Sequence, residues 1–293
     1  MPEQIPSAVS VGNFDGFHLG HQELIRRLKS LAAEKRLATR VLTFQPNPKI
    51  YFGRAIPLIF TDRQKAAILK SQQVDDVIFK PFARVAHLSA AEFVCRELIR
   101  KLSMKALVVG ENFRFGADRT GDTEFLKRFA SAEGFHLELV PSLQWNGGRV
   151  SSSRIRELLL KGAVDEAAHL LGRHYYIDGV VVSGAGRGRE LGFPTINLDT
   201  DNPILPRGVF STRVEWKGRL FPAVTNIGSS PTFSRSFQQV ETHIIDFHRQ
   251  IYQSRVRIHF LYKLRDVFRF ETTAELIAQI RRDVRNACID TNG

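Results

Sequence analysis

The sequence is poor in cysteine and in long apolar runs, and both absences exclude classes of protein. Cys95 and Cys288 are the only two cysteines, without the spacing of a zinc site or a disulfide framework. No apolar run approaches the roughly 20 residues of a membrane-spanning helix. The opening MPEQIPSAVSVG also lacks a basic segment followed by a signal-peptide core. We therefore expect two reduced thiols in a cytoplasmic protein that does not bind a membrane.

Basic tracts are also missing, although the chain is strongly basic. Its formal net charge is +12 over 293 residues. This charge suits nucleic acid, an anionic membrane surface or acidic small molecules such as ATP. The lysines and arginines are dispersed, and the densest clusters are short, such as Arg26-Arg27 and Arg187-Gly188-Arg189. Dispersion disfavours nucleic acid as the main ligand.

The first half of the chain alternates short apolar strands with helical segments, which is typical of a parallel α/β sheet with crossover helices. We predict strands at Ala8–Val11, Arg40–Thr43, Val77–Phe79, Ala106–Val109 and His136–Val140. Helices are predicted where apolar positions recur at three and four residues, at His21–Glu34, Asp62–Lys70, Ala90–Leu102 and Asp122–Ala132.

The second half is different in kind, because turn residues separate β-rich runs after Gly172. Two short helices, Ser152–Lys161 and Val164–Leu171, form an expected connector broken at Gly162. Strands are predicted at Ile177–Val182, Val209–Glu215, Phe221–Thr225, Val240–Ile245 and Val256–Leu264, before a closing helix at Thr273–Ala287. This pattern favours a small antiparallel barrel. The predicted fold is thus a Rossmann-like α/β domain at 1–160, a helical connector at 161–173 and an antiparallel β-barrel domain at 174–293.

The first predicted strand runs into the segment Gly-Asn-Phe-Asp-Gly-Phe-His-Leu-Gly-His at 12–21, and a helix follows. A glycine-rich turn at a helix N-terminus can present backbone N–H groups to phosphate. His18 and His21 can both donate hydrogen bonds to a phosphate that gains charge in a transition state. Neither Walker-A nor G-x-G-x-x-G spacing is present here. An ordinary turn with a capping histidine pair stays open, whereas zinc is disfavoured because two histidines make an incomplete site.

At these residues the chain resembles the prokaryotic bifunctional riboflavin kinase/FAD synthetase family, whose signature is similar to segment 12–21. Three further segments resemble the family in order: Thr-Phe-Gln-Pro-Asn-Pro at 43–48, Gly-Glu-Asn-Phe-Arg-Phe-Gly at 110–116, and Arg-Val-Ser-Ser-Ser-Arg-Ile-Arg at 149–156. In the second of these, a polar loop with aromatic core anchors stays open as an alternative. In the third, the alternative is a helix N-cap with an exposed arginine.

The resemblance implies an FMN adenylyltransferase, or FAD synthetase, in the first domain. Its expected nucleotide-binding residues are Gly12, Asn13, Phe14, Asp15, Gly16, Gly20, Ser152 and Ser153. The residues expected to stabilise developing charge are His18, His21 and Arg156, and the flavin is expected at Asn112, Phe113 and Phe115.

A second glycine-rich segment, 184–192, follows the first predicted barrel strand, and Pro-Thr-Ile-Asn at 194–197 follows it. Glycines permit close backbone approach to a polyphosphate, although a flexible linker would have the same composition. If the chain is extended there, Thr195 and Asn197 lie on one face and can meet a Mg²⁺ ion that bridges ATP oxygens. We therefore assign Gly186, Arg187 and Gly188 to nucleotide binding, and Thr195 and Asn197 to the metal.

These segments resemble the P-T-A-N motif of riboflavin kinases, with Ile196 in place of the small residue and Ser183 where many relatives carry histidine. Segments 226–233 and 241–247 are similar to further motifs of the family. By resemblance, Glu241 is the general base for the ribityl 5′-hydroxyl, although a surface carboxylate is the alternative. His243 is expected in the core or behind the site, and Arg265 either contacts the flavin or lies on the surface.

The resemblance therefore implies ATP- and Mg²⁺-dependent phosphorylation of riboflavin to FMN, followed by adenylylation of FMN to FAD with release of pyrophosphate. It extends from Val9 to Asp283. Two other readings stay open. One is a nucleotidyltransferase for another phosphorylated substrate, which the Pro-Thr-x-Asn segment disfavours. The other is a basic nucleic-acid-binding protein.

Overall fold

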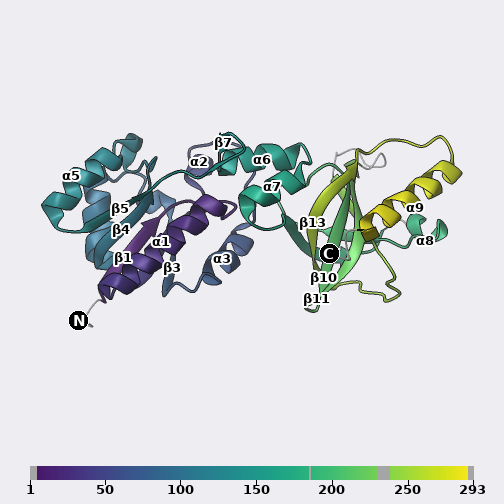
Figure 1. Cartoon of the computed structure of the whole chain (residues 1–293), viewed down its shortest axis with the longest axis horizontal. Coiled ribbons are helices and arrows are strands. Elements are labelled where there is room, and N and C mark those ends of the chain that lie inside the picture. Colours follow the sequence, from purple (N-terminus) through teal and green to yellow (C-terminus); the bar gives the residue numbers. More distant parts are fainter. Residues whose placement is uncertain (1–4, 185, 230–237, 290–293) are drawn as a thin grey trace. The chain divides into compact units, whose positions relative to one another are not determined.

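A computed structural model describes residues 5–184, 186–229 and 238–289 (Figure 1). The chain forms two compact units, one of Met1–Pro57 with Asp62–Ser152, and one of Leu58–Thr61 with Ser153–Gly293. We call them the sheet unit and the barrel unit. Residues 230–233, at the end of one predicted motif, lie outside the described residues. The predicted fold class, a Rossmann-like α/β domain and an antiparallel barrel with a closing helix, is confirmed.

The sheet unit contains a five-stranded parallel sheet in the order β3-β2-β1-β4-β5. Its strands are β1 (Ser7–Val11), β2 (Ala38–Gln45), β3 (Asp76–Pro81), β4 (Met104–Gly110) and β5 (His136–Val140). All five residues of the central strand β1 are buried. Continuous burial follows because helices cover both faces of a parallel sheet.

Two apolar clusters lie on opposite faces of this sheet. On one face, Leu28 of α1 (Leu19–Lys35) and Leu69 of α3 (Asp62–Lys70) pack against Ala8 of β1. On the other, Val94 and Leu126 pack against Val9, the next residue of β1. That face is covered by α4 (Ala90–Glu92), the π-helix η2 (Phe93–Arg100) and α5 (Thr123–Glu133). The shorter elements of the unit are α2 (Pro48–Tyr51), η1 (Phe82–Arg84), η3 (Ala117–Arg119), β6 (Gln144–Trp145) and β7 (Gly148–Arg149).

The barrel unit contains a closed barrel in the order β10-β11-β12-β9-β8-β13. Its strands are β8 (Tyr176–Val182), β9 (Ile196–Asp199), β10 (Gly208–Trp216), β11 (Arg219–Ser229), β12 (Gln238–Ile244) and β13 (Arg255–Arg265). Lys217 and Gly218 form the two-residue turn between β10 and β11, at φ angles of 51° and 73°. Positive φ at both turn residues matches the twist of an antiparallel hairpin.

Three threonines connect neighbouring strands inside the barrel wall. The Thr225 hydroxyl lies 2.8 Å from that of Thr212 and 2.9 Å from that of Thr242. All three residues are buried, so these bonds satisfy hydroxyls that would be costly to bury alone. Because side chains alternate along a strand, Asn226 and Glu241, the chain neighbours of Thr225 and Thr242, point to the other face.

Four helices complete the barrel unit: α6 (Ser152–Leu160), α7 (Val164–Leu171), α8 (Arg187–Glu190) and α9 (Thr273–Ile289). Helix α9 packs on β10, β11 and β13, where Ala287 meets Val209 and Val224 (Figure 1). Strand β9 and helix α8 were not predicted, because each has only four residues. No helix in the described part of the chain is long and apolar enough to cross a membrane.

Four residues from the first half of the sequence belong to the barrel unit. Ile59 and Phe60 of Leu58–Thr61 are 0% and 2% exposed. The Phe60 ring centroid lies 5.5 Å from that of Tyr175 and 4.7 Å from that of Tyr176. The Arg173 guanidinium lies 5.5 Å from the centre of the same ring. An aromatic stack thus ties this segment, which we call the anchor, to the start of β8.

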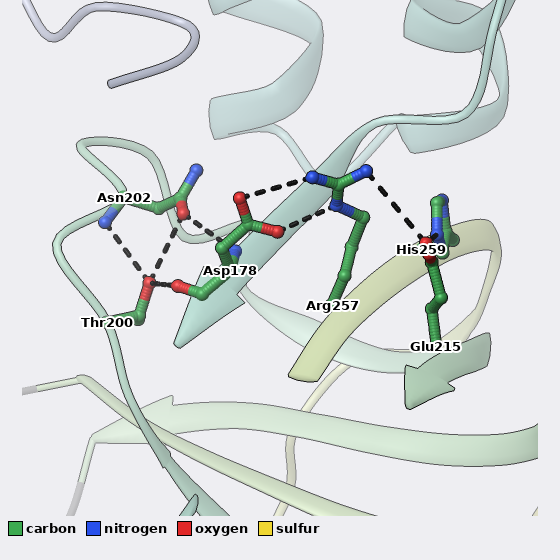
Figure 2. Close-up of polar contacts among 6 residues, drawn as sticks. All are labelled: Asp178, Thr200, Asn202, Glu215, Arg257 and His259. Carbon is green, nitrogen blue, oxygen red and sulfur yellow. Dashed lines mark hydrogen bonds and ion pairs between the residues drawn. The ribbon is translucent and has the colours of Figure 1, made fainter. Parts of the chain in front are cut away.

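A polar network on the barrel wall includes Asp178, Glu215, Arg257 and His259 (Figure 2). Arg257 of β13 donates from Nε to Asp178 of β8 at 2.7 Å, and its guanidinium lies 4.1 Å from the centre of the Tyr176 ring. His259 donates from Nε2 to Glu215 of β10 at 3.0 Å. Burial is the main cause of two pKa shifts nearby: it raises the pKa of Tyr176 and lowers the pKa of His174. The network holds three neighbouring strands together beside Phe60.

Candidate active sites

Two buried aromatic side chains fix the conformation of the turn after β1. Phe14 and Phe17 adopt φ angles of 49° and 43°, which few residues other than glycine adopt, and both rings are buried. Gly12 donates its N–H to the Leu42 carbonyl at 3.1 Å, which fixes the start of the turn. Backbone strain of this kind persists where the surroundings hold it, and it gathers at functional sites.

His18 and His21 lie together at the N-terminus of α1. His18 is the residue that precedes the helix, and its ring stacks on that of His21 with centroids 3.7 Å apart and planes 16° apart. A Cβ at Gly20 would come within 3.2 Å of the His18 ring, so a glycine leaves room for that ring. Two imidazoles beside the positive end of a helix dipole form an arrangement suited to a developing negative charge.

The remaining predicted nucleotide residues fall in both units. Ser152, the last residue of the sheet unit, donates its hydroxyl to the Asp15 carbonyl of the glycine-rich turn at 2.9 Å. Ser153 and Arg156 belong to the barrel unit, where the Arg156 Nη1 lies 3.4 Å from the Ser153 hydroxyl. Participation of Arg156 in the histidine site therefore stays a prediction.

The predicted flavin residues of the sheet unit have different environments. Asn112 donates to the Ser142 hydroxyl at 3.0 Å. The backbone N–H of Ser142 donates to the neighbouring Glu111 carboxylate, and this bond is the main reason that the pKa of Glu111 is lowered. Phe115 is buried in the core cluster that contains Val94, whereas Phe113 is only partly buried and stacks on Phe115 at 5.2 Å. Phe115 thus fixes the loop to the core of the sheet unit. A flavin contact by either ring stays a prediction.

A cavity of about 970 Å³ opens on the face of the barrel wall that α9 covers. Among its lining residues are six that the sequence singled out: Gly186, Gly188, Thr195, Asn197, Glu241 and Arg265. They come from the glycine-rich loop, the start of β9, β12 and β13, so closure of the barrel brings together residues far apart in sequence. Arg187 begins α8, and its side chain is outside the described part of the structure.

The glycine-rich loop closely approaches the two predicted metal ligands. A Cβ at Gly184 would overlap the Asn197 amide, and one at Gly188 would lie 3.1 Å from the Thr195 hydroxyl. His243 donates from Nδ1 to the Pro194 carbonyl at 2.9 Å, because a carbonyl can only accept. His243 therefore holds the segment that carries Thr195, and it also lines the cavity.

Polar side chains form a row across three adjacent strands in this cavity. Asn226 of β11 is the register partner of Glu241 of β12, which is in turn the partner of Asn197 of β9. Gln239, two residues before Glu241, donates to the Asn197 Oδ1 at 2.9 Å. Asn226 and Gln239 were not predicted as site residues, because only strand register places them beside Glu241 and Asn197.

An ion pair closes the cavity between β13 and α9. Arg265 donates from Nη2 to the Asp283 Oδ2 at 2.9 Å, and Gln279 donates to the Asp283 Oδ1 at 2.8 Å. The Arg265 guanidinium also lies 4.7 Å from the centre of the Phe268 ring. Arg265 is thus part of the cavity wall, and direct contact with a flavin stays a prediction.

The donors in this cavity fit a hard cation that is held mainly by a nucleotide. Within the described ranges, no group of three or more His, Cys, Asp or Glu side chains could hold a metal alone. Mg²⁺ typically takes one or two protein oxygens and completes its shell with water and substrate phosphates. The Thr195 hydroxyl and the Asn197 amide oxygen supply such ligands, and the lack of a Cβ at Gly188 keeps the Thr195 hydroxyl uncrowded.

Comparisons with known proteins agree across both units. A family model described as FAD synthetase matches residues 1–154, and one described as riboflavin kinase matches residues 171–289. Proteins named bifunctional riboflavin kinase/FMN adenylyltransferase are similar to nearly the whole chain. The protein from Haemophilus influenzae is 36% identical, and the match covers 96% of this chain and 92% of the Haemophilus protein. The one from Pseudomonas fluorescens is 36% identical, with coverages of 98% and 93%.

A solved structure gives the same picture of the fold. The crystal structure described as a macrolide-efflux protein from Streptococcus pneumoniae has a TM-score of 0.90 at 31% sequence identity. The likeness covers 98% of this chain and 94% of that chain. Both units therefore have their counterpart in one solved chain.

Proposed function

Because the chain belongs to the family of bifunctional riboflavin kinase/FMN adenylyltransferases, we propose that its two reactions take place at two separate sites, one in each unit. The enzyme phosphorylates riboflavin to FMN and adenylylates FMN to FAD, using ATP with a divalent metal. Nothing favours nucleic acid or another phosphorylated substrate. We further propose that the metal is Mg²⁺. We also propose that the modules span 1–160 and 174–293, joined by 161–173, and that the residues described below act in each.

In the barrel site, Glu241 accepts the proton of the ribityl 5′-hydroxyl as the oxygen attacks the γ-phosphorus of ATP. ADP leaves as the phosphoryl group is transferred. Thr195 and Asn197 hold Mg²⁺, which would neutralise charge on the phosphate oxygens when bound. Gly186, Gly188 and Arg187 cradle the polyphosphate. One observation carries this assignment: the loop, Thr195, Asn197 and Glu241 all line one cavity.

In the sheet site, a phosphate oxygen of FMN attacks the α-phosphorus of ATP, and pyrophosphate leaves. His18, His21 and Arg156 stabilise the charge that develops on the phosphate. Gly12, Asn13, Phe14, Asp15, Gly16, Gly20, Ser152 and Ser153 contact the nucleotide. The FMN of this site lies against Asn112, Phe113 and Phe115. Arg265 belongs to the barrel site, where it lies against the flavin of riboflavin. Stacking of His18 on His21 at a helix N-terminus supports this role.

The test uses two variants of the full chain, His21→Ala and Glu241→Gln. Each is incubated with ATP and Mg²⁺, once with riboflavin and once with FMN, and the flavins are separated by chromatography. His21→Ala should reduce FAD formation about 10²- to 10³-fold, the usual cost of a lost transition-state donor, and leave FMN formation intact. Glu241→Gln should block FMN formation and leave conversion of supplied FMN intact, because an amide keeps the shape but cannot accept the proton.

Each variant is the control for the other, since the altered residues lie in different units. Equal loss of both activities in a folded variant would contradict the assignment of one reaction to each unit. Replacing Mg²⁺ with Ca²⁺ in the unaltered enzyme tests the metal, because Ca²⁺ prefers more ligands at longer distances. Full activity with Ca²⁺ would count against Mg²⁺ as the selected ion.

The location of the protein in the cytoplasm, which the sequence led us to expect, stays a prediction.

A further inference from the structure

Asn226 has a polar group that the proposed mechanism does not use. Its Oδ1 is buried and has no hydrogen-bond partner among the residues that the structure describes. A buried amide oxygen without a partner costs free energy, so a position that keeps one calls for an explanation. Asn226 lines the cavity that Glu241, Asn197 and Thr195 also line. Because this acceptor has almost no exposed surface, an occupant of the cavity would fill it by turning the Asn226 amide.

Strand register places Asn226 directly beside Glu241. The two are Cα partners on neighbouring antiparallel strands, and partners of this kind have Cβ atoms about 4.5–5.5 Å apart. Their chain neighbours Thr225 and Thr242 are also partners, and the hydroxyls of those two are hydrogen-bonded on the other face. The Asn226 and Glu241 side chains thus share the cavity face, within reach of a common ligand.

The comparison with Asn197 shows what differs at Asn226. Both flank Glu241 in the row, and both are amides that can donate through Nδ2 and accept through Oδ1. The Asn197 Oδ1 already accepts a hydrogen bond from Gln239, whereas the Asn226 Oδ1 is buried without one from the described residues. Asn197 is oriented by the protein, and Asn226 is left to be oriented by a ligand.

We propose that Asn226 positions the ribityl chain of riboflavin and the Glu241 carboxylate relative to each other. Its Oδ1 accepts a hydrogen bond from a ribityl hydroxyl next to the reacting one, and its Nδ2 donates to Glu241. The proton of the 5′-hydroxyl passes to Glu241 as before, and Asn226 itself gains and loses no proton. This inference rests on the proposed function and adds the residue that selects which hydroxyl meets the base.

The experiment compares Asn226→Leu, Asn226→Asp and a control, Arg219→Ala, which alters an exposed residue at the far end of the same strand. Leucine keeps the approximate volume and removes both polar atoms. Asn226→Leu should lower kcat/KM for riboflavin about 10- to 100-fold, the effect of losing one or two ligand hydrogen bonds. The KM for ATP and conversion of supplied FMN to FAD should not change. Arg219→Ala should match the unaltered enzyme.

The pH profile separates positioning from a merely structural role. Loss of the Nδ2 donor favours the protonated form of Glu241, so the acid limb of kcat should move to higher pH in Asn226→Leu. Asn226→Asp should move it further, because a second carboxylate beside Glu241 disfavours charge on both. Riboflavin binding, followed by quenching of flavin fluorescence, should weaken in Asn226→Leu even without ATP.

The outcomes are distinguishable from failure of the proposed function. If the unaltered enzyme forms FMN while Asn226→Leu has the same KM for riboflavin, the same riboflavin affinity and the same acid limb, the inference is overturned and the function stands. If Asn226→Leu loses riboflavin phosphorylation but neither riboflavin affinity nor the pH profile shifts, the residue is structural and the inference also fails. An unaltered enzyme that forms no FMN would overturn both.

Discussion

Replacing Arg265 with methionine is expected to destabilise the barrel unit, because it leaves a buried carboxylate without its cation. The Arg265 side chain is 17% exposed and that of Asp283 is 4% exposed, so water cannot take over the lost interaction. Removing one partner of a buried ion pair typically costs about 3–5 kcal/mol of unfolding free energy. Gln279 still donates to Asp283, which places the expected loss near the lower end of that range. Methionine keeps most of the apolar length that packs on Phe268.

The double variant Arg265→Met/Asp283→Leu should recover most of that stability, because neither charge then remains buried alone. The Lys161–Glu157 pair on α6 is a matched control, with N and O 2.6 Å apart but both side chains more than 60% exposed. Breaking it with Lys161→Met should cost about 0–1 kcal/mol. The contrast between the two pairs isolates the effect of burial from that of distance.

The assay is urea unfolding of the full chain, read by tryptophan fluorescence. The chain has two tryptophans, and Trp145→Phe leaves Trp216 in β10 as the reporter of the barrel unit. All variants are measured in that background. A loss below about 1 kcal/mol for Arg265→Met, like that of an exposed pair, would refute the reasoning. A double variant no more stable than either single variant would show that the two residues are not coupled.

Two further predictions concern the anchor and the glycine-rich loop. Phe60→Ala should destabilise the barrel unit by about 3–5 kcal/mol, the usual cost of truncating a buried phenylalanine, with Trp216 as the reporter. Phe52→Ala, at an exposed position of the sheet unit, should change that transition little, and equal effects of the two would contradict the role of the anchor. Gly184→Ala should abolish riboflavin phosphorylation and spare FMN adenylylation, because the new Cβ would overlap Asn197. Gly228→Ala, where the nearest atom would lie 3.6 Å away, should be tolerated in the same flavin assay.

Much of the fold could be predicted because local signals and burial agree along most of the chain. The helices Asp62–Lys70 and Val164–Leu171 begin and end where predicted, and Gly172 ends the second with a φ of 67°. Strand β5 likewise has its predicted bounds. The predicted helix at Ala90–Leu102 is instead mostly the π-helix η2, whose hydrogen-bond register has no local sequence signature. Strand β9 was missed because its alternation of apolar and polar residues extends over only four positions.

The sites could be predicted only to the level of single motifs. The stacked histidines lie three residues apart, so a helical reading already brings them together. The row of Asn197, Glu241 and Asn226 depends on the register of β11 with β12 and on the pairing of β12 with the distant β9. Alternation alone does not give that register. Arg265 had two readings, and the choice between surface and cavity wall depends on where α9 packs.

The anchor has a consequence for how such a chain can be recombined. The aromatic site at Tyr175 and Tyr176 is filled by Phe60, which is encoded more than a hundred residues earlier, inside the other half of the sequence. A gene split at one point therefore cannot give each product all of its own core. Grafting this barrel onto a different partner would require that partner to supply an Ile-Phe loop, or Tyr175 and Tyr176 to be redesigned as solvent-facing residues. The coding sequence of the sheet unit thus carries part of the core of the barrel unit, so the two units have to be inherited together.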